Sequence, residues 1–316
     1  MKKFLVTALL AVMALTIACC ALAEGRQAPA DMAVIETTDV ISEKTLFRKY
    51  DQSFFDSEST QPGTVVRIDY TTDVYGEPID TWANVYLPYG YDESGTTRYD
   101  ILYFMHGTNE NQDSFIGEAR VKNAIDNMIE VGVAEPFIMV CPTYYYDYPT
   151  RSTDHQTFVY EVRKDLMPAV ESTYHTYAET ADEAGFIASR EHRAFSGYSQ
   201  GSGVTWVLFG GMLDYAKWFL PFSGGNPSKL EGVLTALDAY SDYADDIFIY
   251  MACGGKRDAA YEGTNALMDL LIAQDAFSYG MDTSENNLCY TLSNEIHQTM
   301  MSRFYLYNAF LDVLFK

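Results

Sequence analysis

The sequence predicts an α/β fold: a mostly parallel, twisted sheet of about eight strands with helices on both faces. Three observations lead to this prediction. Continuous apolar runs, typical of strands buried on both faces, occur at residues 100–105 and 136–141. Segments with apolar residues at helical spacing follow such runs, and strands that alternate with helices pair in parallel. The pentapeptide Gly-Tyr-Ser-Gln-Gly at 197–201 matches Gly-x-Ser-x-Gly, a pattern typical of a sharp turn between a strand and a helix.

The composition indicates one large globular unit. The chain has 316 residues, of which 48% are apolar and 15% aromatic. The sequence contains no internal repeat, low-complexity linker or second domain. We expect three parts: a leader at residues 1–23, a polar N-terminal arm at 24–62 that lies over the domain, and the domain itself at 63–316.

The leader has the features of a secretory signal peptide. Two lysines at residues 2–3 precede an almost wholly apolar run at 4–18, and a small-x-small cleavage site follows at 21–23. The apolar run is short for a retained membrane anchor. Lipoprotein anchoring at Cys19 or Cys20 fits less well, because the residues before each cysteine depart from a lipobox. We therefore expect a protein that is cleaved near Ala23 and secreted.

The formal net charge is −23, and it becomes −25 once residues 1–23 are removed. Such a surface repels nucleic acid and anionic membranes and suits a neutral substrate. A solvated acidic surface alone accounts for most of this charge. The sequence leaves the oligomeric state open.

Three cysteines remain after the leader: Cys141, Cys253 and Cys289. All three lie in apolar, strand-like runs, where a buried thiol is the ordinary finding. The odd number and the spacing indicate neither a disulfide framework nor a cysteine metal site.

The elements can be expected in a definite order. An antiparallel hairpin comes first, and the strands after it are separated by helices, with N-cap residues at 152–154 before a long helix that Pro168 should bend. Strands are expected at 63–70, 81–88, 100–105, 136–141, immediately before the pentapeptide, and at 218–222, 247–252 and 288–292. Helices are expected at 119–129, 154–170, after the pentapeptide, and at 230–240, 259–273 and 300–314, the last of them amphipathic.

The pentapeptide predicts a nucleophile elbow, with Ser199 raised above the edge of the sheet. A chance match is the alternative, and the strand and helix patterns on either side disfavour it. An antiparallel start, buried middle strands and an elbow after the fifth strand describe an α/β-hydrolase. Residues 63–316 are therefore expected to form an α/β-hydrolase catalytic domain.

A serine nucleophile needs a base and an orienting carboxylate, which in this fold follow it in the order acid, then histidine. His297 is the one histidine C-terminal to Ser199, and it follows the last predicted strand. Asp258 follows the seventh strand after two glycines and is the expected acid. Glu262 is the nearest competitor, and a helix N-cap is the other assignment for Asp258.

The oxyanion hole needs two backbone N–H groups. One should belong to Gln200, directly after the nucleophile, and the other to Gly107 or Thr108, after the third strand. His106 precedes this loop and is expected to brace it; its place in the order disfavours a second base.

Substrate contacts are expected from an aromatic loop after the fourth strand. Aromatic faces there could stack on sugar rings or on an aromatic acyl group, and packing within the loop is the alternative. The tyrosines concerned are Tyr144, Tyr145, Tyr146 and Tyr148, whereas Trp82, Trp206 and Trp218 are expected in the core. No metal-binding or phosphate-binding motif is present, so no metal and no cofactor are expected.

With these residues in place, the chain resembles carbohydrate esterase family 1, the feruloyl and acetyl xylan esterases of the esterase-D-like α/β-hydrolases. The resemblance rests on residues 83–88, 102–107, 191–201, and 252–254 leading to 258–261. It implies a secreted serine esterase that removes feruloyl or acetyl groups from plant cell-wall polysaccharide such as xylan. The alternatives are hydrolysis or acyl transfer on a small non-carbohydrate ester, and a non-catalytic glycan-binding module.

The chain also departs from the family pattern. Gln200 stands where the family usually has methionine, and Ser202 stands where it usually has a second glycine. No tryptophan follows His297, although the family's base commonly lies in a Gly-x-His-x-Trp-like context.

Overall fold

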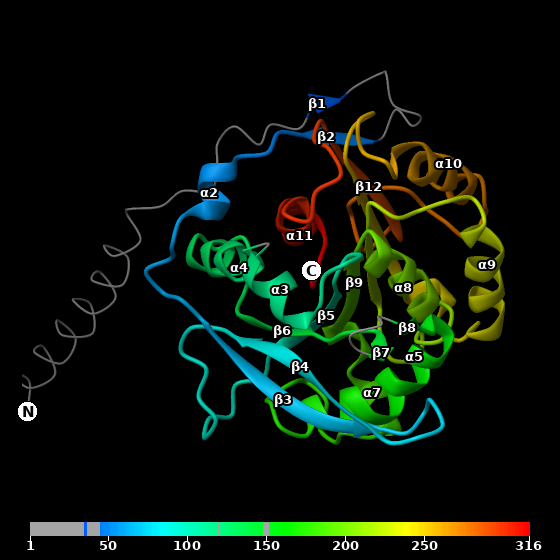
Figure 1. The fold of residues 1–316 in the computed structure, drawn as a ribbon. Coiled ribbons are helices and arrows are strands. Elements are labelled where there is room, and N and C mark those ends of the chain that lie inside the picture. The colour runs from blue at the N-terminus through cyan, green and yellow to red at the C-terminus, as the bar shows by residue number, and fades with distance from the viewer. Residues whose placement is uncertain (1–34, 37–44, 119, 148–151) are drawn as a thin grey trace, which may run out of the picture.

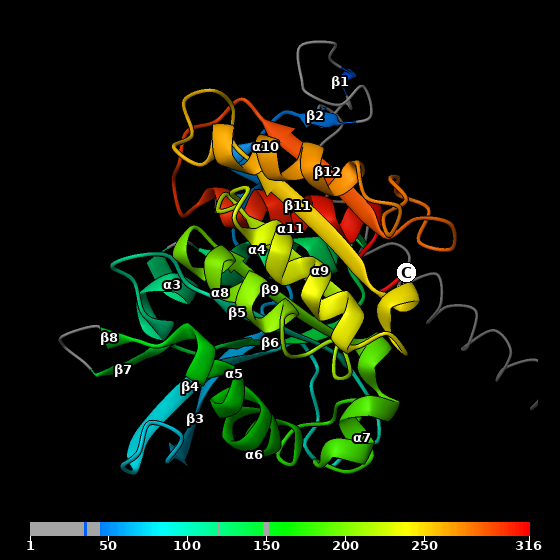
Figure 2. The same cartoon turned by 90° about the vertical axis from the view of Figure 1, so that its right-hand side faces the viewer.

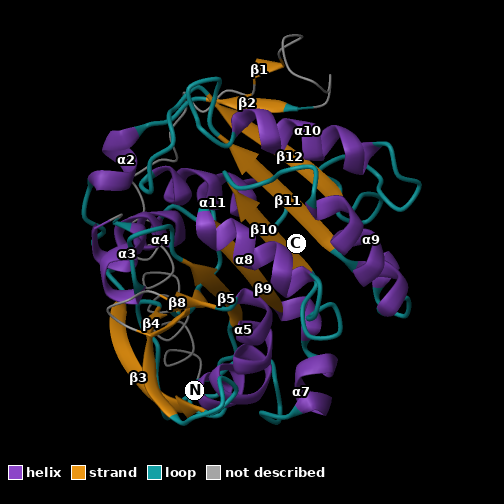
Figure 3. Cartoon of the chain, turned by 45° about the vertical axis from the view of Figure 1, so that its right-hand side comes forward, coloured by secondary structure: helices purple, strands orange, loops and turns teal. Residues whose placement is uncertain are grey.

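The computed structural model describes residues 35–36, 45–118, 120–147 and 152–316 (Figure 1). The expected leader at 1–23 lies outside these residues. The expected α/β-hydrolase fold is confirmed: one large, mostly parallel sheet runs through the centre of the domain, and helices cover both of its faces (Figure 3).

The sheet has ten strands in the order β1-β2-β12-β11-β10-β9-β5-β6-β4-β3. The strands from β2 to β6 in this order are parallel, and the β3–β4 hairpin and β1 pair antiparallel at the two edges. A separate two-stranded sheet pairs β7 with β8. The strands are β1 Ile35–Glu36, β2 Leu46–Arg48, β3 Thr64–Thr72, β4 Ile79–Leu87, β5 Asp100–Met105, β6 Phe137–Cys141, β7 Tyr145–Asp147, β8 Ser152–Thr153, β9 Arg193–Tyr198, β10 Trp218–Phe222, β11 Phe248–Cys253 and β12 Leu288–Ser293.

The helices divide between the two faces of the sheet. Figure 2 shows α8, α9 and α10 in front of the sheet, with α4 and α11 behind it. Each face has its own apolar core, one shared with α5, α6, α8, α9 and α10 and the other with α2, α3, α4 and α11. The helices are α2 Gln52–Asp56, α3 Gln112–Glu118, α4 Val121–Glu130, α5 His155–Glu161, α6 Met167–Glu171, α7 Glu183–Ala188, α8 Gln200–Phe209, α9 Lys229–Ala239, α10 Tyr261–Ile272 and α11 Met301–Asp312.

The long helix expected at 154–170 forms, but it is interrupted. Asp154 caps its N-terminus by accepting a hydrogen bond from the Thr157 N–H at 3.1 Å. A π-helical turn, Val162–Leu166, separates α5 from α6, and Pro168 lies in the first turn of α6. The irregular turn precedes Pro168 because proline has no N–H to donate to the preceding turn. The proline ring also crowds the carbonyl groups of that turn.

The last helix corrects one expectation. Helix α11 was expected to be amphipathic, yet every residue from Met301 to Phe310 is buried. The helix lies between the sheet and the N-terminal arm: Tyr305 contacts Phe222 of β10, with 5.6 Å between ring centroids, and Tyr307 contacts Phe54 of α2, also at 5.6 Å. The arm therefore covers the face that the sequence pattern left for solvent.

The described part of the arm is integrated into the domain. Strand β2 adds to the sheet beside β12, and its Arg48 forms a buried ion pair with Asp312 at the end of α11. Arg303 of α11 reaches back to Asp56 of α2, with 2.9 Å between Nη1 and Oδ1. These contacts join the arm to the two elements that flank the loop at 294–300.

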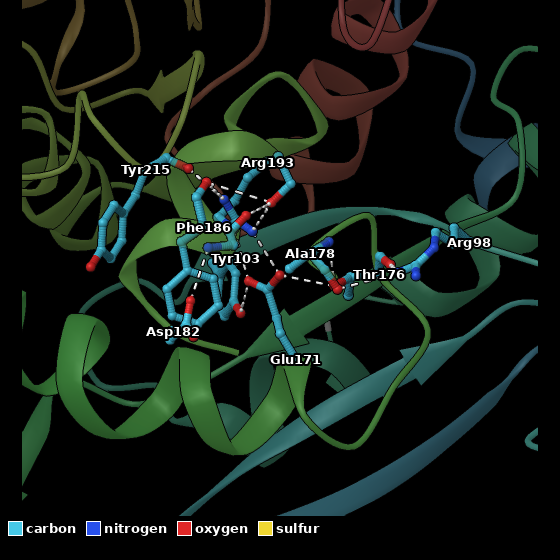
Figure 4. Close-up of polar contacts among 11 residues, drawn as sticks. Arg98, Tyr103, Glu171, Thr176, Ala178, Asp182, Phe186, Arg193 and Tyr215 are labelled. Atoms are coloured by element: carbon cyan, nitrogen blue, oxygen red, sulfur yellow. Dashed lines mark hydrogen bonds and ion pairs between the residues drawn. The ribbon is translucent and has the colours of Figure 1, made fainter. Parts of the chain in front are cut away.

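A buried ion pair joins the start of β9 to the end of α6 (Figure 4). Glu171 accepts two hydrogen bonds from Arg193, at 2.8 Å from Nε and 2.7 Å from Nη2. The hydroxyls of Tyr103 and Thr176 each donate to the same carboxylate at 3.0 Å. Both charged side chains are at most 1% exposed, so the network replaces the water that the charges lose on folding.

Glu161 of α5 is a second buried carboxyl group, held beneath the β3–β4 hairpin. Burial raises its pKa to about 7, against the hydrogen bonds from Tyr70 and Tyr75, which lower it. The folded protein thus holds this proton more tightly than the unfolded chain does. Its contribution to stability is complete below pH 4.5 and is lost as the pH rises through about 7.

We expect Glu161→Gln to remove this pH dependence. Between pH 4.5 and pH 7, the free energy of unfolding of the wild type should fall by about 3 kcal/mol relative to the variant. Urea unfolding at a series of pH values measures this difference. Glu183→Gln, at an exposed position on α7, is the control for the loss of one carboxylate. Parallel pH profiles for wild type and Glu161→Gln would contradict the prediction.

Two further observations concern the described residues as a whole. Cys141, Cys253 and Cys289 are buried free thiols. Among the helices of the described ranges, none combines the length and the apolar character that crossing a membrane requires.

Candidate active site

Ser199 lies at the turn between β9 and α8, in a backbone conformation that few non-glycine residues adopt. Its φ is 57° and its ψ is −113°. The flanking glycines allow the strand and the helix to approach this closely. A Cβ on Gly197 would lie 2.1 Å from the carbonyl oxygen of Gly201, and a Cβ on Gly201 would lie 2.3 Å from that of Met105. The sharp turn presents the Ser199 hydroxyl at the carboxyl edge of the sheet.

The structure brings Ser199, His297 and Asp258 together in a continuous chain of hydrogen bonds. His297 Nε2 lies 2.8 Å from Ser199 Oγ, and His297 Nδ1 lies 2.7 Å from Asp258 Oδ1. The three residues come from the β9–α8 turn, the loop after β12 and the loop after β11. A carboxylate only accepts hydrogen bonds, so Nδ1 carries the proton and Nε2 accepts from the serine hydroxyl. This arrangement can remove the serine proton as Oγ attacks an electrophile.

Asp258 is buried, and four groups donate hydrogen bonds to it. Besides His297, these are the Ala260 N–H at 2.8 Å, the Ser223 hydroxyl at 2.9 Å and the Gly254 N–H at 3.0 Å. Burial alone would raise the pKa of this carboxyl group, but the hydrogen bonds outweigh it and hold the pKa below the ordinary value. The group is therefore an anion at neutral pH, suited to orient an imidazole.

The competing acid, Glu262, is exposed in the first turn of α10 and is not among the hydrogen-bonding partners of His297. Ser223 was not singled out from the sequence. It follows β10 with a φ of 49°, which turns its hydroxyl to Asp258. No local motif marks this position, because the contact joins two loops that are 35 residues apart.

Gly107 and Thr108, from the loop after β5, line the same cavity as Ser199, and Gln200 directly follows the serine. The N–H of Gly107 donates to Glu110 Oε2 at 2.7 Å and is therefore occupied. The N–H groups of Thr108 and Gln200 have no hydrogen-bond partner among the described residues. Of the two candidates in the first loop, only Thr108 thus has an N–H ready to bind a developing negative charge.

His106 braces this loop, as expected. Its Nδ1 lies 2.9 Å from the Gly107 carbonyl oxygen, and its Nε2 lies 2.9 Å from the Thr143 hydroxyl. The side chain is fully buried. Because the side chain is buried and both ring nitrogens are hydrogen-bonded, His106 is not placed to act as a second base.

The cavity in front of Ser199 has a volume of about 520 Å³. One wall is the loop after β5, and the other is the segment that begins at His297. Its lining residues are Gly107, Thr108, Glu110, Tyr198, Ser199, His297, Gln298, Thr299 and Met300. Polar groups predominate, as expected for a site that admits a polar ester and water.

The four tyrosines of the aromatic loop differ in position. Tyr144 is 1% exposed and donates to the His106 carbonyl oxygen at 2.8 Å, which corrects the expectation that it contacts substrate. The Tyr145 hydroxyl approaches Gln200 Oε1 at 3.4 Å. Tyr146 is half-buried, and Tyr148 lies outside the described residues. Packing therefore accounts for Tyr144, while Tyr145 and Tyr146 remain candidates for substrate contact.

Comparison with known proteins defines the family. The family model described as "Putative esterase" matches residues 79–207, which contain the elbow. The feruloyl esterase module of Clostridium thermocellum, solved as a variant with sinapinate, superposes with a TM-score of 0.74. It is 31% identical, and the match covers 84% of this chain and 92% of that one. The chain belongs to carbohydrate esterase family 1.

Two more relatives show how the chain compares in length and fold. Endo-1,4-beta-xylanase Y of Acetivibrio thermocellus is 34% identical over 257 residues, which are 79% of this chain but 23% of that protein. The chain spans about a quarter of the length of the curated relatives that it matches, 23% and 24%. The ferulic acid esterase AmCE1/Fae1A of Anaeromyces mucronatus has a TM-score of 0.62 at 19% identity, covering 84% of this chain and 96% of that one, a likeness of fold.

The described part of the chain has a further cavity, with a volume of about 400 Å³. Tyr145 and Tyr146 line it together with Trp82 of β4. Trp82 was expected in the core, but the structure leaves it half-buried; Trp206 and Trp218 are buried as expected. The position of Trp82 depends on which side of β4 the neighbouring loops cover, and the sequence of the strand does not carry that information.

Proposed function

We propose that the chain is a secreted serine carboxylic-ester hydrolase that removes feruloyl or acetyl groups from plant cell-wall polysaccharide such as xylan. The observation that carries this proposal is the hydrogen-bonded series Ser199–His297–Asp258 at the elbow, open to a cavity. The names of two relatives support the substrate class: one is a feruloyl esterase module solved with sinapinate, and the other is a xylanase.

In the proposed reaction, Ser199 Oγ attacks the ester carbonyl carbon while His297 Nε2 accepts the hydroxyl proton. The C–O bond to the sugar then breaks, and His297 returns the proton to the leaving oxygen. Water, activated by the same imidazole, attacks the acyl-enzyme and releases the carboxylic acid and the free serine. Asp258 stays ionised throughout, as its lowered pKa favours.

The negative charge that develops on the carbonyl oxygen needs two donors. We assign them to the backbone N–H groups of Gln200 and Thr108. Neither N–H group has a hydrogen-bond partner among the described residues. Gln200 directly follows the reacting serine, and Thr108 lines the cavity in front of it. Glu110 holds the neighbouring N–H of Gly107 and so fixes the loop in this conformation.

Secretion is part of the proposal and rests on the leader at residues 1–23. Polymeric wall polysaccharide cannot enter a cell, so an enzyme acting on it has to work outside. The strongly acidic surface suits a neutral polysaccharide chain.

None of the described residues forms a group of three or more potential metal ligands, and the proposed reaction requires no metal.

Hydrolysis assays on the purified chain test the proposal. We expect turnover of methyl ferulate and of an aryl acetate, and release of acyl groups from esterified xylan oligosaccharides. Turnover of only short acyl esters would restrict the function to acetyl release. Activity on the small esters with none on the esterified oligosaccharides would point to a small-ester hydrolase. Binding of xylan without any hydrolysis would contradict the enzymatic proposal.

A further inference from the structure

We propose that a groove over α8, between α5 and α9, is a second glycan-binding site, which holds a mostly neutral sugar chain by a residue that bears a carboxylate. The inference rests on the proposed function, because it takes a polymeric glycan as the substrate, and it deepens that function by assigning the polymer an acidic sugar. The groove, here called the helix groove, has a volume of about 890 Å³. It shares no lining residue with the cavity in front of Ser199.

Three helices on one face of the sheet form the helix groove. Helix α8 contacts both α5 and α9, and all three lie in front of the sheet in Figure 2. Helix α8 begins directly after Ser199, and Trp206 of the groove follows about two turns later, about 10 Å along the helix axis. A sugar chain held here therefore binds the domain near the reaction centre and leaves the catalytic cavity free.

The lining combines aromatic faces with hydrogen-bonding groups. Tyr160 of α5, Trp206 of α8 and Tyr240 at the end of α9 each contribute a ring, and Tyr160 is 56% exposed. The side chains of Gln156 and Thr235 line the groove as well, and both are exposed. Ring faces favour the flat, apolar face of a sugar, and amide and hydroxyl groups form hydrogen bonds with its hydroxyls.

Gly232 keeps one side of the helix groove open. Glycine inside a helix is less stable than alanine, so its presence there usually has a steric reason. At Gly232 the structure gives none, because a Cβ would meet no atom within 4 Å. The side chain that is missing from this position leaves space for a ligand along α9.

Trp206 offers a hydrogen-bond donor at the wall of the groove. Its side chain is 5% exposed, and its indole N–H has no hydrogen-bond partner in the described part of the chain. A buried indole N–H usually finds an acceptor, and leaving it without one is unfavourable. A hydroxyl group bound in the helix groove is an acceptor of the kind that this wall lacks.

The opposite wall is already ordered. The Arg163 guanidinium forms two hydrogen bonds with the Asp214 carboxylate, both at 2.7 Å, and it lies over the Tyr215 ring at 3.7 Å from the centroid. A wall that is fixed before binding loses little conformational entropy when a ligand arrives. Because Asp214 matches its charge, Arg163 shapes the groove without calling for an anion.

Lys229 is the cation of the helix groove that lacks such a match. It is half-buried at the start of α9, and burial lowers the pKa of its ammonium group. Among the described residues no ion pair compensates this charge. Glu231 also lines the groove, but it lies two positions further along the helix, where side chains do not face each other. An anionic group on the ligand would supply the missing charge.

His155, the first residue of α5, lies close to Lys229. Burial lowers the pKa of its imidazole, and the charge of Lys229 lowers it further, against the opposing effect of the Asp154 carboxylate. The Nε2 atom of His155 is buried and has no hydrogen-bond partner among the described residues. Two basic side chains thus gather near the start of α9, in a chain whose formal net charge is −23.

These charges define the class of ligand. A net charge of −23 disfavours a polyanion, whereas one carboxylate placed at Lys229 meets a local cation. A small anion such as phosphate could meet the same charge, but it would leave the three aromatic faces unused. A neutral sugar chain with an occasional uronic acid residue uses both features.

Isothermal titration calorimetry with two ester-free probes tests the inference. One probe is a xylo-oligosaccharide with a glucuronic acid side group, and the other is the unsubstituted oligosaccharide of the same backbone length. The wild type should bind the acidic probe about 10-fold more tightly, and Lys229→Met should abolish this difference. Tyr160→Ala should weaken the binding of both probes about 5-fold. Lys49→Met, which removes an exposed cation from the arm, is the matched control and should bind as the wild type does.

A second measurement separates the helix groove from the catalytic cavity. Phenylmethanesulfonyl fluoride sulfonylates a reactive serine, so the treated protein carries a bulky group on Ser199. The acidic probe should bind to the treated protein with unchanged affinity, because the two sites share no residue. Loss of binding after treatment would place the probe in the catalytic cavity and overturn the inference.

The other outcomes are equally decisive. Wild-type affinities in both Lys229→Met and Tyr160→Ala would overturn the site, and so would equal losses in Lys229→Met and Lys49→Met. Equal affinity of the wild type for the two probes would overturn the acidic sugar. Hydrolysis of 4-nitrophenyl acetate without binding of either probe would overturn the site and leave the proposed function standing. Binding without any ester hydrolysis would support the site and remove the proposed function.

Discussion

Ser199→Ala is expected to lower kcat for ester hydrolysis by about 10⁶-fold, the loss typical of removing the nucleophile from such a site. The fold should be retained, since among the described residues the hydroxyl forms a hydrogen bond with His297 alone. The variant should also lose the burst of product that precedes steady state when an acyl-enzyme accumulates. Pre-steady-state hydrolysis of 4-nitrophenyl acetate measures both effects.

Ser202→Ala is a matched control for this variant. It removes the same group three residues further along, where the hydroxyl is buried and has no hydrogen-bond partner in the described part of the chain. We expect its kcat to stay within a few-fold of wild type. A comparable loss in the two variants would show that Ser199 acts through the fold and not as the nucleophile.

Asp258→Asn provides a graded companion to these two variants. An amide in this place can donate to His297 Nδ1, which favours the tautomer that carries its proton on Nε2. That tautomer cannot accept the serine proton, and the expected loss in kcat is about 10⁴-fold. Titration of activity against pH, with thermal unfolding as a check on the fold, measures the effect; full activity would exclude Asp258 as the acid.

The second large effect concerns stability. Arg193→Met leaves Glu171 as a buried carboxylate without its cation, and we expect it to lower the free energy of unfolding by about 3–5 kcal/mol. Removing both charges together, in Arg193→Met/Glu171→Leu, should recover part of that loss, because neither charge then stays buried unpaired. Urea unfolding of both variants and of Glu171→Leu completes a double-mutant cycle. Equal losses in the single and double variants would contradict the account.

Local patterns explain what could be predicted about this protein. The patterns that predict the buried strands and the elbow each lie within a few consecutive residues. The positions of the strands along the chain and of Ser199 could therefore be predicted from short stretches of sequence. His297 could be selected because one histidine follows the serine, and Asp258 because the chain order of the fold limits where an acid can stand. These constraints act along the chain and need no knowledge of packing.

Contacts between distant segments explain what could not be predicted. Ser223 has no motif, because its contact with Asp258 joins two loops that are 35 residues apart. Glu110 contacts Gly107 within one irregular loop, where no periodic pattern marks it. Strand β2 has three residues, too few for a periodic pattern, so neither it nor the burial of α11 that the arm produces was visible. The tyrosines show the same limit: adjacent side chains on an extended segment point to opposite sides, so composition alone could not separate Tyr144 from Tyr145.

The position of β2 has a consequence for the solution behaviour of the domain. Without the arm, β12 would be the edge strand, and its residues 291–293, which pair with β2, would form an open border towards the solvent. Such an open border is a template on which another chain can add a strand, and repeated addition leads to aggregation. The arm occupies that border with strands of three and two residues, the second of them antiparallel, and leaves little template behind. By covering this edge, the arm is expected to lower the tendency of the domain to aggregate through β12.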